Sequence, residues 1–304
     1  MNQIMSFLDL VTDKSEPPEP IIGNGILLPQ TLLTIIGAPK VGKSFLAFNI
    51  ATALASGNGF ACFKIDKRQK TLILSAEGGY YPNKDRIKRI TNNIDRKSLK
   101  NHAYIKLNCN LYIDKKEHYD EIEGLISKHK IDVLILDPFI RFHHQEENSS
   151  SGMSEVMALI RQLIMSTDIS VILIHHTGKQ VNRGGRGSSV ITGEYDSAIY
   201  MGKGGNGKVQ LKFDMRHVEI PPNVDLQFNS DTFWFEESMD SATESENQAV
   251  ALLKKNGGRM KKSDIVKKLE ENNTASSSTA YRWIDSAKKD NEITENLGKL
   301  EVVE

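Results

Sequence analysis

The segment Gly37-Ala38-Pro39-Lys40-Val41-Gly42-Lys43-Ser44 has the residue types and spacing of a phosphate-binding loop. Its glycines let backbone N–H groups converge on phosphate oxygens. The helix expected from Lys43 onward, with Phe45 in its first turn, adds the positive end of its dipole. Lys43 is suited to bind the β- and γ-phosphates, and the Ser44 hydroxyl to join a magnesium shell. The loop and Phe45 therefore form a candidate site for ATP and Mg²⁺.

Two carboxylates follow apolar segments that we predict to be strands. The segment 131–137 ends in Asp137 and has the form of a Walker B element, so Asp137 is predicted to hold magnesium directly or through water. Glu77 follows the predicted strand 71–75, and a carboxylate at the carboxyl edge of an open sheet can deprotonate the attacking water. The alternatives are a turn-capping role for Asp137 and a solvated loop position for Glu77.

Two pairs of histidines are candidates for polar chemistry. His175 and His176 end a predicted strand, where neighbouring side chains point to opposite faces and are poorly placed to share a metal ion. We predict that His176 faces the γ-phosphate, with a structural polar contact as the alternative. His143 and His144 lie in a polar segment without metal-ligand spacing, so no metal site is expected there.

The elements that position these residues follow from hydrophobic patterning between residues 21 and 237. The buried-strand candidates are 32–36, 71–75, 131–137 and 170–174, whose nearly continuous hydrophobicity fits strands covered on both faces. Apolar spacing over 156–164 predicts a helix, and the Asn-Gly pair within 204–207 predicts an antiparallel hairpin. The sequence therefore predicts an α/β domain with a mostly parallel sheet, preceded by a proline-rich arm over residues 1–20.

Composition narrows the class of protein less than the motifs do. The 304 residues include 39 Lys+Arg and 39 Asp+Glu, so net charge neither favours nor excludes a nucleic-acid partner. Cys62 and Cys109 lie far apart without a Cys-x-x-Cys pattern, so neither a zinc site nor a disulfide framework is expected. No stretch approaches the roughly 18 apolar residues that span a bilayer, and the N-terminus lacks a signal-peptide pattern. We therefore expect a cytoplasmic protein with no membrane partner.

A second, smaller domain is predicted beyond an acidic, polar linker over residues 238–247. Residues 248–304 offer three short helices and then a hairpin around residues 297–299, a pattern that resembles a winged helix-turn-helix. Its recognition helix would be 278–289, with Arg282 and Lys288 as candidate DNA contacts. A protein-docking module is the alternative, because that fold serves both purposes.

The order of these motifs resembles the RecA-like P-loop core of hexameric replicative helicases, especially the RepA-like plasmid helicase group. The resemblance covers residues 23–235 and rests on GAPKVGKS, SAEGG, LILDPF, EENS, IHHTGK, RGSS and a later arginine. It implies that Glu77 is the catalytic carboxylate, His176 the phosphate sensor and Arg216 a finger that reaches the neighbouring subunit's γ-phosphate. Related ring helicases often carry a lysine two positions before that arginine. Asp214 stands there instead, which leaves Lys212 or Arg216 alone for this role.

The basic, glycine-rich segment between His176 and Ile191 resembles the channel loops of RecA-like rings that touch the single-stranded DNA backbone. Its candidate contacts are Lys179, Arg183 and Arg186. A solvated loop is the alternative, because the segment lacks the aromatic residues that would stack on bases.

These features together predict an ATP-driven motor that assembles as a homo-oligomeric, hexameric ring and unwinds DNA. Its partners would be single-stranded DNA and, through the second domain, duplex DNA, during replication of a plasmid, phage or mobile element. One rival is a RecA-like recombination or repair ATPase that does not unwind DNA. Another is a DNA-binding regulator whose assembly ATP switches. A small-molecule kinase is disfavoured, because the chain has no evident acceptor-binding lid.

Overall fold

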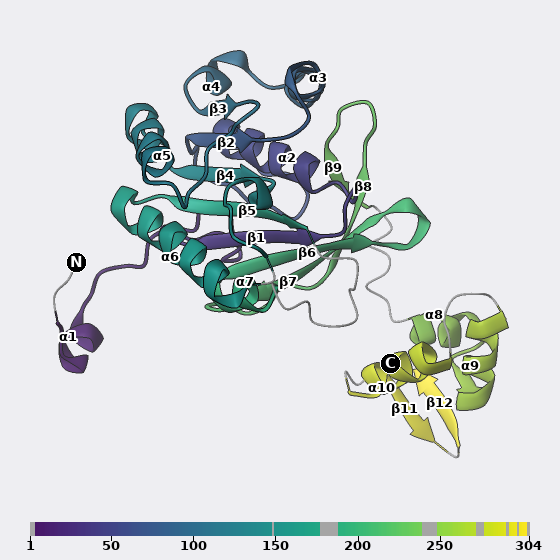
Figure 1. Ribbon diagram of the computed structural model, residues 1–304. Helices are drawn as coiled ribbons and strands as arrows, with labels where there is room; N and C mark the ends of the chain where they lie inside the picture. The colour runs from purple at the N-terminus through teal and green to yellow at the C-terminus, as the bar shows by residue number, and fades with distance from the viewer. Residues whose placement is uncertain are drawn as a thin grey trace. The chain divides into compact units, whose positions relative to one another are not determined.

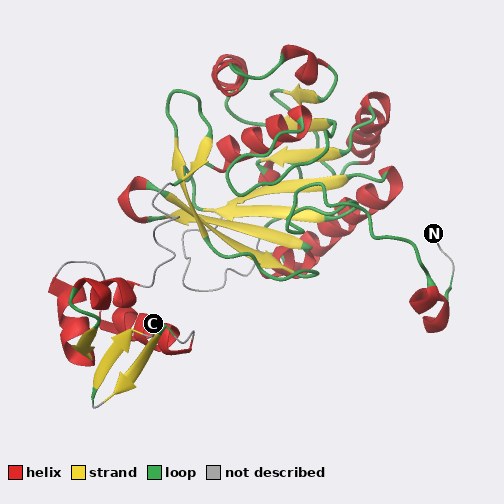
Figure 2. Cartoon of the chain, turned by 180° about the vertical axis from the view of Figure 1, so that it is seen from behind, coloured by secondary structure: helices red, strands yellow, loops and turns green. Residues whose placement is uncertain are grey.

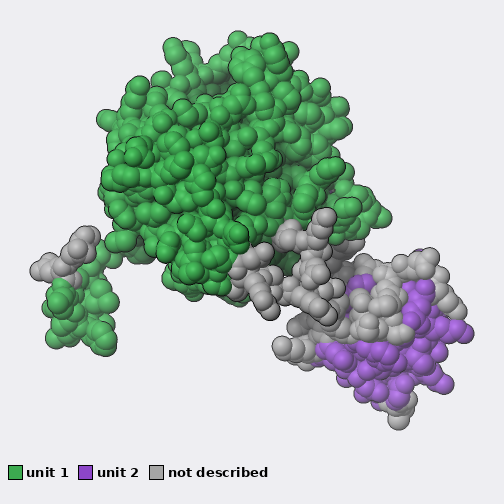
Figure 3. Space-filling view, viewed as in Figure 1, with its two compact units in different colours: residues 1–237 green, residues 238–304 purple. Residues whose placement is uncertain are grey.

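The computed structural model describes residues 4–147, 149–176, 188–238, 248–271, 277–289, 292–296 and 298–302. The chain divides into two compact units, residues 1–237 and residues 238–304 (Figure 3). Among the described residues there is no helix that is both long and apolar enough to cross a membrane.

A nine-stranded sheet forms the centre of the first unit, in the order β3-β2-β4-β5-β1-β6-β7-β8-β9 (Figure 1). The strands are β1 (Leu32–Gly37), β2 (Thr71–Ser75), β3 (Ala103–Lys106), β4 (Val133–Asp137), β5 (Ser170–His176), β6 (Ser197–Lys203), β7 (Val209–Met215), β8 (Val224–Phe228) and β9 (Phe235–Glu237). In sheet order the first six strands are parallel, and β7 to β9 continue the sheet antiparallel. The prediction of a mostly parallel α/β sheet is confirmed.

Helices cover both faces of this sheet (Figure 2). The helices of the first unit are α1 (Phe7–Thr12), α2 (Lys43–Ser56), α3 (Tyr80–Ile90), α4 (Arg96–Lys100), α5 (Lys116–His129), α6 (Ser150–Thr167) and α7 (Ser188–Glu194). Alternate residues of a strand face opposite sides of a sheet. Leu33 and Ile35 of β1 accordingly join a core cluster with α2, whereas Leu32 and Ile36 join a second cluster with α5 and α6. The sheet is thus buried on both faces, as its continuous hydrophobicity predicted.

The predicted strands and the hairpin appear at or near the expected positions. β2 has the predicted bounds, β4 starts two residues later than predicted, and β6 and β7 pair antiparallel. The sequence analysis missed β3 and the helices between residues 80 and 129. Every residue of β3 is only partly buried, so this edge strand of four residues lacks the apolar run that marks the central strands.

The second unit contains α8 (Gln248–Lys255), β10 (Arg259–Lys261), α9 (Lys262–Glu271), α10 (Ser277–Lys289), β11 (Ile293–Asn296) and β12 (Lys299–Val302). Its strands form an antiparallel sheet in the order β10-β12-β11. The sequence analysis missed β10, because a single apolar residue in Arg-Met-Lys gives no strand pattern. That strand forms because Met260 pairs with Leu300 of β12, whose side chain is fully buried.

We predict that a chain lacking residues 240–304 folds. Its midpoint of thermal unfolding should equal that of the first unit in the full-length protein. The two large core clusters contain only residues before 238, and the third cluster contains only residues after it. Circular dichroism during heating measures this directly. A deletion of residues 224–304 is the control, because it also removes the buried Leu226 and Phe235 and should unfold the unit. Aggregation of the shorter deletion would show that residues 240–304 contribute to folding of the first unit.

Candidate nucleotide-binding site

The phosphate-binding loop joins the carboxyl end of β1 to α2. Gly42 precedes α2 with a φ of 104°, a left-handed backbone that glycine adopts without strain. A Cβ atom on Gly42 would also lie 2.8 Å from Cζ of Phe235. At the other end of the loop, a Cβ atom on Gly37 would lie 2.6 Å from the carbonyl oxygen of Met201 in β6. Close packing on both sides therefore requires glycine at these two positions.

Lys43 opens α2 with its side chain buried in the loop. Its Nζ donates hydrogen bonds to the carbonyl oxygens of Gly37 at 2.7 Å and Ala38 at 2.9 Å. Burial lowers the pKa of Lys43 to about 8, and the charge of Asp137 opposes this shift. The loop's own carbonyls thus hold the ammonium, and anionic phosphate oxygens would be stronger partners for it.

The ammonium of Lys43 also lies 3.0 Å from Nδ1 of His176, the last residue of β5. An ammonium can only donate, so Nδ1 accepts and the neutral ring carries its proton on Nε2. Burial, and then the charge of Lys43, lower the pKa of His176, which keeps the ring neutral at pH 7. His176 therefore lies beside the phosphate-binding lysine with Nε2–H as its donor.

Ser44 and Asp137 meet although 93 positions separate them, because the Ser44 hydroxyl donates a hydrogen bond of 3.1 Å to Oδ1 of Asp137. Asp137 ends β4 and is 5% exposed. Burial raises its pKa to about 6, against the lowering effect of the Ser44 hydrogen bond. Mg²⁺ prefers oxygen ligands of these two types. The pair fits a magnesium ion, which would stabilise the buried carboxylate in its ionised form.

Glu77 lies close to this pair because Ser75, the last residue of β2, is the register partner of Asp137. The Glu77 side chain is 54% exposed, and its Oε1 accepts a hydrogen bond of 3.2 Å from Nε of Arg141. Arg141 ends the short 3-10 helix η1 (Phe139–Arg141), which follows β4. The arginine orients a carboxylate that water can reach.

The first turn of α3 fixes the loop that carries Glu77. Asn83 is fully buried, and its Nδ2 donates to the carbonyl oxygens of Glu77 at 3.0 Å and Gly79 at 2.9 Å. Arg86 donates a hydrogen bond of 3.2 Å to Oδ1 of Asn83, and its guanidinium lies 4.9 Å from the ring centroid of Phe45. Sequence reasoning missed Asn83, Arg86 and Arg141. The only signal for them was their closeness in sequence to Glu77 and Asp137.

Phe45 supports the loop from the side of the core. Its ring lies 4.9 Å from that of Phe228 and 5.1 Å from that of Phe233, measured between centroids. The exposed residues of the loop are Ala38, Pro39 and Lys40, and Val41 is buried. Contact with a nucleotide is therefore open to residues 38–40, whereas the ring of Phe45 packs among aromatic side chains.

The other histidines have separate surroundings. His175 is 4% exposed, its Nδ1 lies 3.6 Å from Oε1 of Glu147, and burial lowers its pKa to about 4. The backbone N–H of His144 donates to Asp114, and Nδ1 of His143 lies 3.0 Å from the carbonyl oxygen of Gln145. No group of three or more His, Cys, Asp or Glu side chains within the described parts of the chain could hold a metal ion.

Arg216 directly follows β7, at the edge of the sheet opposite the phosphate-binding loop. Met215 pairs with Ser197, and Ser197 pairs with Leu33, four positions before Gly37 in β1. Strand residues rise ~3.3 Å each, so the end of β7, after which Arg216 follows, lies ~13 Å along the strands from Gly37. Strand geometry therefore separates Arg216 from Lys43, Ser44 and Asp137 of its own chain.

The guanidinium of Arg216 donates a hydrogen bond of 2.6 Å to the carbonyl oxygen of Gly193 in α7. Asp214, which stands where related ring helicases often carry a lysine, accepts a hydrogen bond of 2.6 Å from the hydroxyl of Tyr195. That hydroxyl also lies 3.0 Å from the hydroxyl of Tyr200. The departure from the family pattern thus provides a hydrogen-bond acceptor for Tyr195, which precedes β6.

The candidate nucleic-acid contacts are less fully placed. Lys179, Arg183 and Arg186 lie outside the described residues, and the side chain of Arg282 in α10 also lies outside them. Lys288 of α10 forms an ion pair with Glu295 of β11. Its charge is therefore partly neutralised within the second unit.

The sequence and the fold of this chain can be compared with those of known proteins. A family model described as AAA domain matches residues 3–182, which is more than half of the chain. The chain belongs to this AAA-domain family. A search of the curated proteins found no match for it.

Two solved structures share the fold of this AAA-domain protein. One is described as an ATPase domain, with a TM-score of 0.53 and 13% identity over 69% of this chain and 85% of that chain. The other is a DnaB-like replicative helicase studied with primase, with a TM-score of 0.52 and 12% identity over 68% of this chain. The match spans 57% of that helicase chain. The fold is thus that of a RecA-like P-loop core.

We predict that Asp137→Asn stabilises the nucleotide-free AAA-domain protein while weakening its use of Mg²⁺. Burial raises the pKa of Asp137 from 3.8 to about 6, so the ionised form costs stability above pH 6 and this cost is lost as pH falls towards 4. The substitution should add up to about 3 kcal/mol to the free energy of unfolding at pH 8, and less at pH 5. Chemical denaturation at both pH values measures the difference.

Asp132→Asn is the control, because Asp132 precedes the same strand at its opposite end and is exposed. It should leave both stability and Mg²⁺-dependent nucleotide binding unchanged. Equal or lower stability of Asp137→Asn at pH 8 would contradict the account of a costly buried charge.

Proposed function

We propose that this protein hydrolyses ATP with Mg²⁺ and works as a ring-forming DNA helicase in replication of a plasmid, phage or mobile element. The proposal rests on three groups of side chains, each suited to one part of the reaction, that lie together at one edge of the sheet. A buried lysine, a serine–aspartate pair and a glutamate lie together at the carboxyl ends of β1, β2 and β4, in Lys43, Ser44–Asp137 and Glu77. Likeness to a solved ATPase domain and to a DnaB-like replicative helicase supports the helicase class.

Each residue of the site has a role that its contacts allow. Lys43 and the backbone N–H groups of the loop bind the phosphates, and Ser44 and Asp137 hold the metal ion. Mg²⁺, when bound, neutralises charge on the phosphates. Glu77, oriented by Arg141, accepts the proton of the attacking water. The Nε2–H of His176 donates to the γ-phosphate, which makes that ring the sensor.

Arg216 serves the nucleotide of a neighbouring copy in this proposal. Its distance from the loop of its own chain disfavours a role there, whereas its exposed position after β7 suits a contact between subunits. A head-to-tail interface that closes on itself generates a ring, and we propose a hexamer. DNA would pass through the ring, with Lys179, Arg183 and Arg186 as its backbone contacts.

The second unit would act as a winged helix-turn-helix that binds duplex DNA. Its order of helix, strand, helix, helix and hairpin, with a three-stranded antiparallel sheet, supports this assignment. α10 is the proposed recognition helix and Arg282 its DNA contact. The ion pair of Lys288 with Glu295 makes Lys288 the weaker candidate.

We predict that Glu77→Gln retains ATP binding and loses turnover by roughly 10²- to 10⁴-fold, because the amide keeps the shape of the side chain but accepts no proton. Lys43→Ala should lose both binding and hydrolysis. ATP hydrolysis with and without single-stranded DNA, and ATP-dependent strand displacement from a forked duplex, measure these effects. Glu146→Gln is the control, because Glu146 is an exposed carboxylate in the segment between η1 and α6. Wild-type turnover in Glu77→Gln would assign the base to another carboxylate, and hydrolysis without unwinding would favour a recombination ATPase.

We predict that Arg216→Ala binds ATP normally but hydrolyses it roughly 10³- to 10⁵-fold more slowly, as expected for an arginine finger. Mixing it with Glu77→Gln should recover part of the activity, because some interfaces then pair an intact Glu77 with an intact Arg216. The measurement is the hydrolysis rate of equal mixtures after subunit exchange has been verified by mass. If the mixture stays as inactive as its components, Arg216 acts within its own chain and the shared site is wrong.

A further inference from the structure

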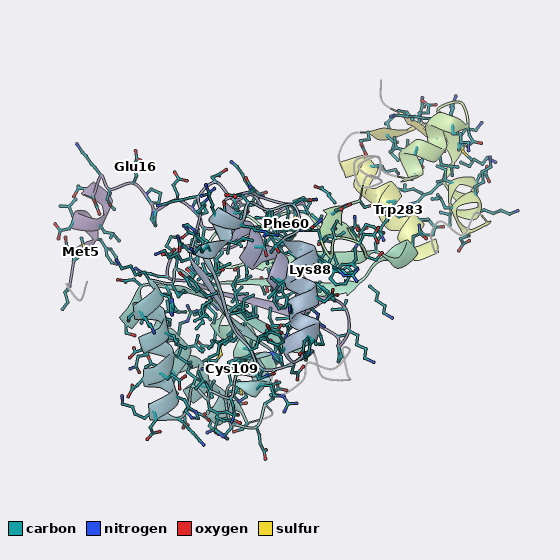
Figure 4. All side chains as sticks on the ribbon, turned by 90° about the horizontal axis from the view of Figure 1, so that it is seen from above. Met5, Glu16, Phe60, Lys88, Cys109 and Trp283 are labelled. Atoms are coloured by element: carbon teal, nitrogen blue, oxygen red, sulfur yellow. The ribbon has the colours of Figure 1, made fainter. Side chains whose placement is uncertain are left out.

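The surface formed by α3 and α4 is strongly basic in a chain of zero net charge. Residues 80–100 contain seven lysines and arginines and two aspartates. Six of these cations are exposed, and for five of the six the structure gives no ion pair with any described residue: Lys84, Lys88, Arg96, Lys97 and Lys100. Figure 4 labels Lys88 on α3. Unpaired cations of this density favour an anionic partner.

Two aromatic side chains extend this basic surface at the start of α3. Tyr80 is 55% exposed and Tyr81 is 77% exposed, and their ring centroids lie 5.2 Å apart in an edge-to-face arrangement. The ammonium of Lys84 lies 5.8 Å from the ring centroid of Tyr80. Tyr80, Lys84 and Lys88 are four residues apart in turn and form one stripe of ~12 Å along the helix.

The two arginines of α3 contact aromatic rings of the core, whereas the stripe of Tyr80, Lys84 and Lys88 faces solvent. Arg86 lies over the ring of Phe45, and Arg89 lies over the ring of Phe233 while pairing with Asp85. Ile87 of α3 and Leu99 of α4 line the same cavity of about 170 Å³ beside α2. The two helices therefore flank one feature of the core, with their basic residues outward.

We propose that α3 and α4 bind single-stranded nucleic acid, as a contact surface distinct from the segment of residues 177–187 and from the second unit. Lysines and arginines without acidic partners suit the phosphate backbone, and exposed tyrosines offer faces on which bases stack. An acidic protein surface would use the cations but not the tyrosine faces. The combination of both residue types therefore favours a single strand over a second copy of the chain.

This surface is joined directly to the catalytic loop. Tyr80 follows Gly79, and Asn83 in the first turn donates hydrogen bonds to the carbonyl oxygens of both Glu77 and Gly79. A movement of α3 on binding would therefore be transmitted to Glu77 through the side chain of Asn83. Stimulation of hydrolysis by a single strand, which rests on the proposed ATPase function, would pass in part through this helix.

The test is binding of fluorescent oligothymidylate and oligouridylate to the full-length protein, measured by anisotropy over a range of salt concentrations. Lys84→Glu combined with Lys88→Glu should weaken binding at least ~10-fold and reduce the salt slope by about 1.4, for two lost phosphate contacts. Tyr80→Ala with Tyr81→Ala should also weaken it, and the two Tyr→Phe changes should not, because stacking needs only the ring. The two oligonucleotides separate DNA from RNA as the source of the strand.

Lys115→Glu, at the N-cap of α5, combined with Lys128→Glu on α5 is the matched control. Lys115 lies over the ring of Tyr112, as Lys84 does over Tyr80, and Lys128 is an exposed helix lysine like Lys88. This control should bind as the wild type does. If the wild type binds and the α3 variant binds equally well, the surface proposal is overturned and the proposed function stands. If the α3 variant loses only self-association, the surface binds a second copy, which also overturns the proposal. A wild type that binds no oligonucleotide would overturn both.

Discussion

The buried ammonium of Lys43 is the interaction on which the rest of the site depends. A buried charge without partners costs several kcal/mol, so the loop must bring polar atoms to it. Two carbonyl oxygens and Nδ1 of His176 do so within 3.0 Å. This arrangement requires the close approach of Gly37 to β6 and the left-handed backbone of Gly42, and it fixes the protonation of the histidine. One buried cation thus links the conformation of the loop, the start of α2 and the end of β5.

The charges of the site are only partly compensated by the protein. Burial lowers the pKa of Lys43 to about 8 and raises that of Asp137 to about 6, so both groups are shifted towards their neutral forms. Phosphate oxygens and a metal ion would reverse both shifts, because each supplies the opposite charge. The fold tolerates this cost because apolar clusters on both faces of the sheet stabilise the strands that hold the site. Binding free energy and folding stability are therefore linked at the same two residues.

The sequence predicted what is local in the chain. The glycine and lysine spacing of residues 37–44 and the apolar runs of the central strands indicated the loop, the sheet and the helix that follows it. Contacts between distant segments were not predictable in the same way. Arg141 contacts Glu77 across 64 positions only because β2 and β4 are neighbours in the sheet. A hydrophobic pattern identifies strands but does not indicate their order in a sheet. β10 was missed for a related reason, since its stability comes from pairing with β12.

The parallel sheet also explains why the site is open. All carboxyl ends of its parallel strands meet at one edge, so Lys43, Asp137 and Glu77 gather there, and the antiparallel β7 carries Arg216 to the other edge. No described residue covers Glu77, which is half exposed, or the crest of the loop at residues 38–40. Electrostatic stabilisation of a transferring phosphoryl group is strongest where water is excluded. In the proposed function, a site whose lysine is buried and whose glutamate is exposed would be completed by a surface from outside these elements, and a cation at the opposite edge of an identical copy would have the charge that such a surface needs.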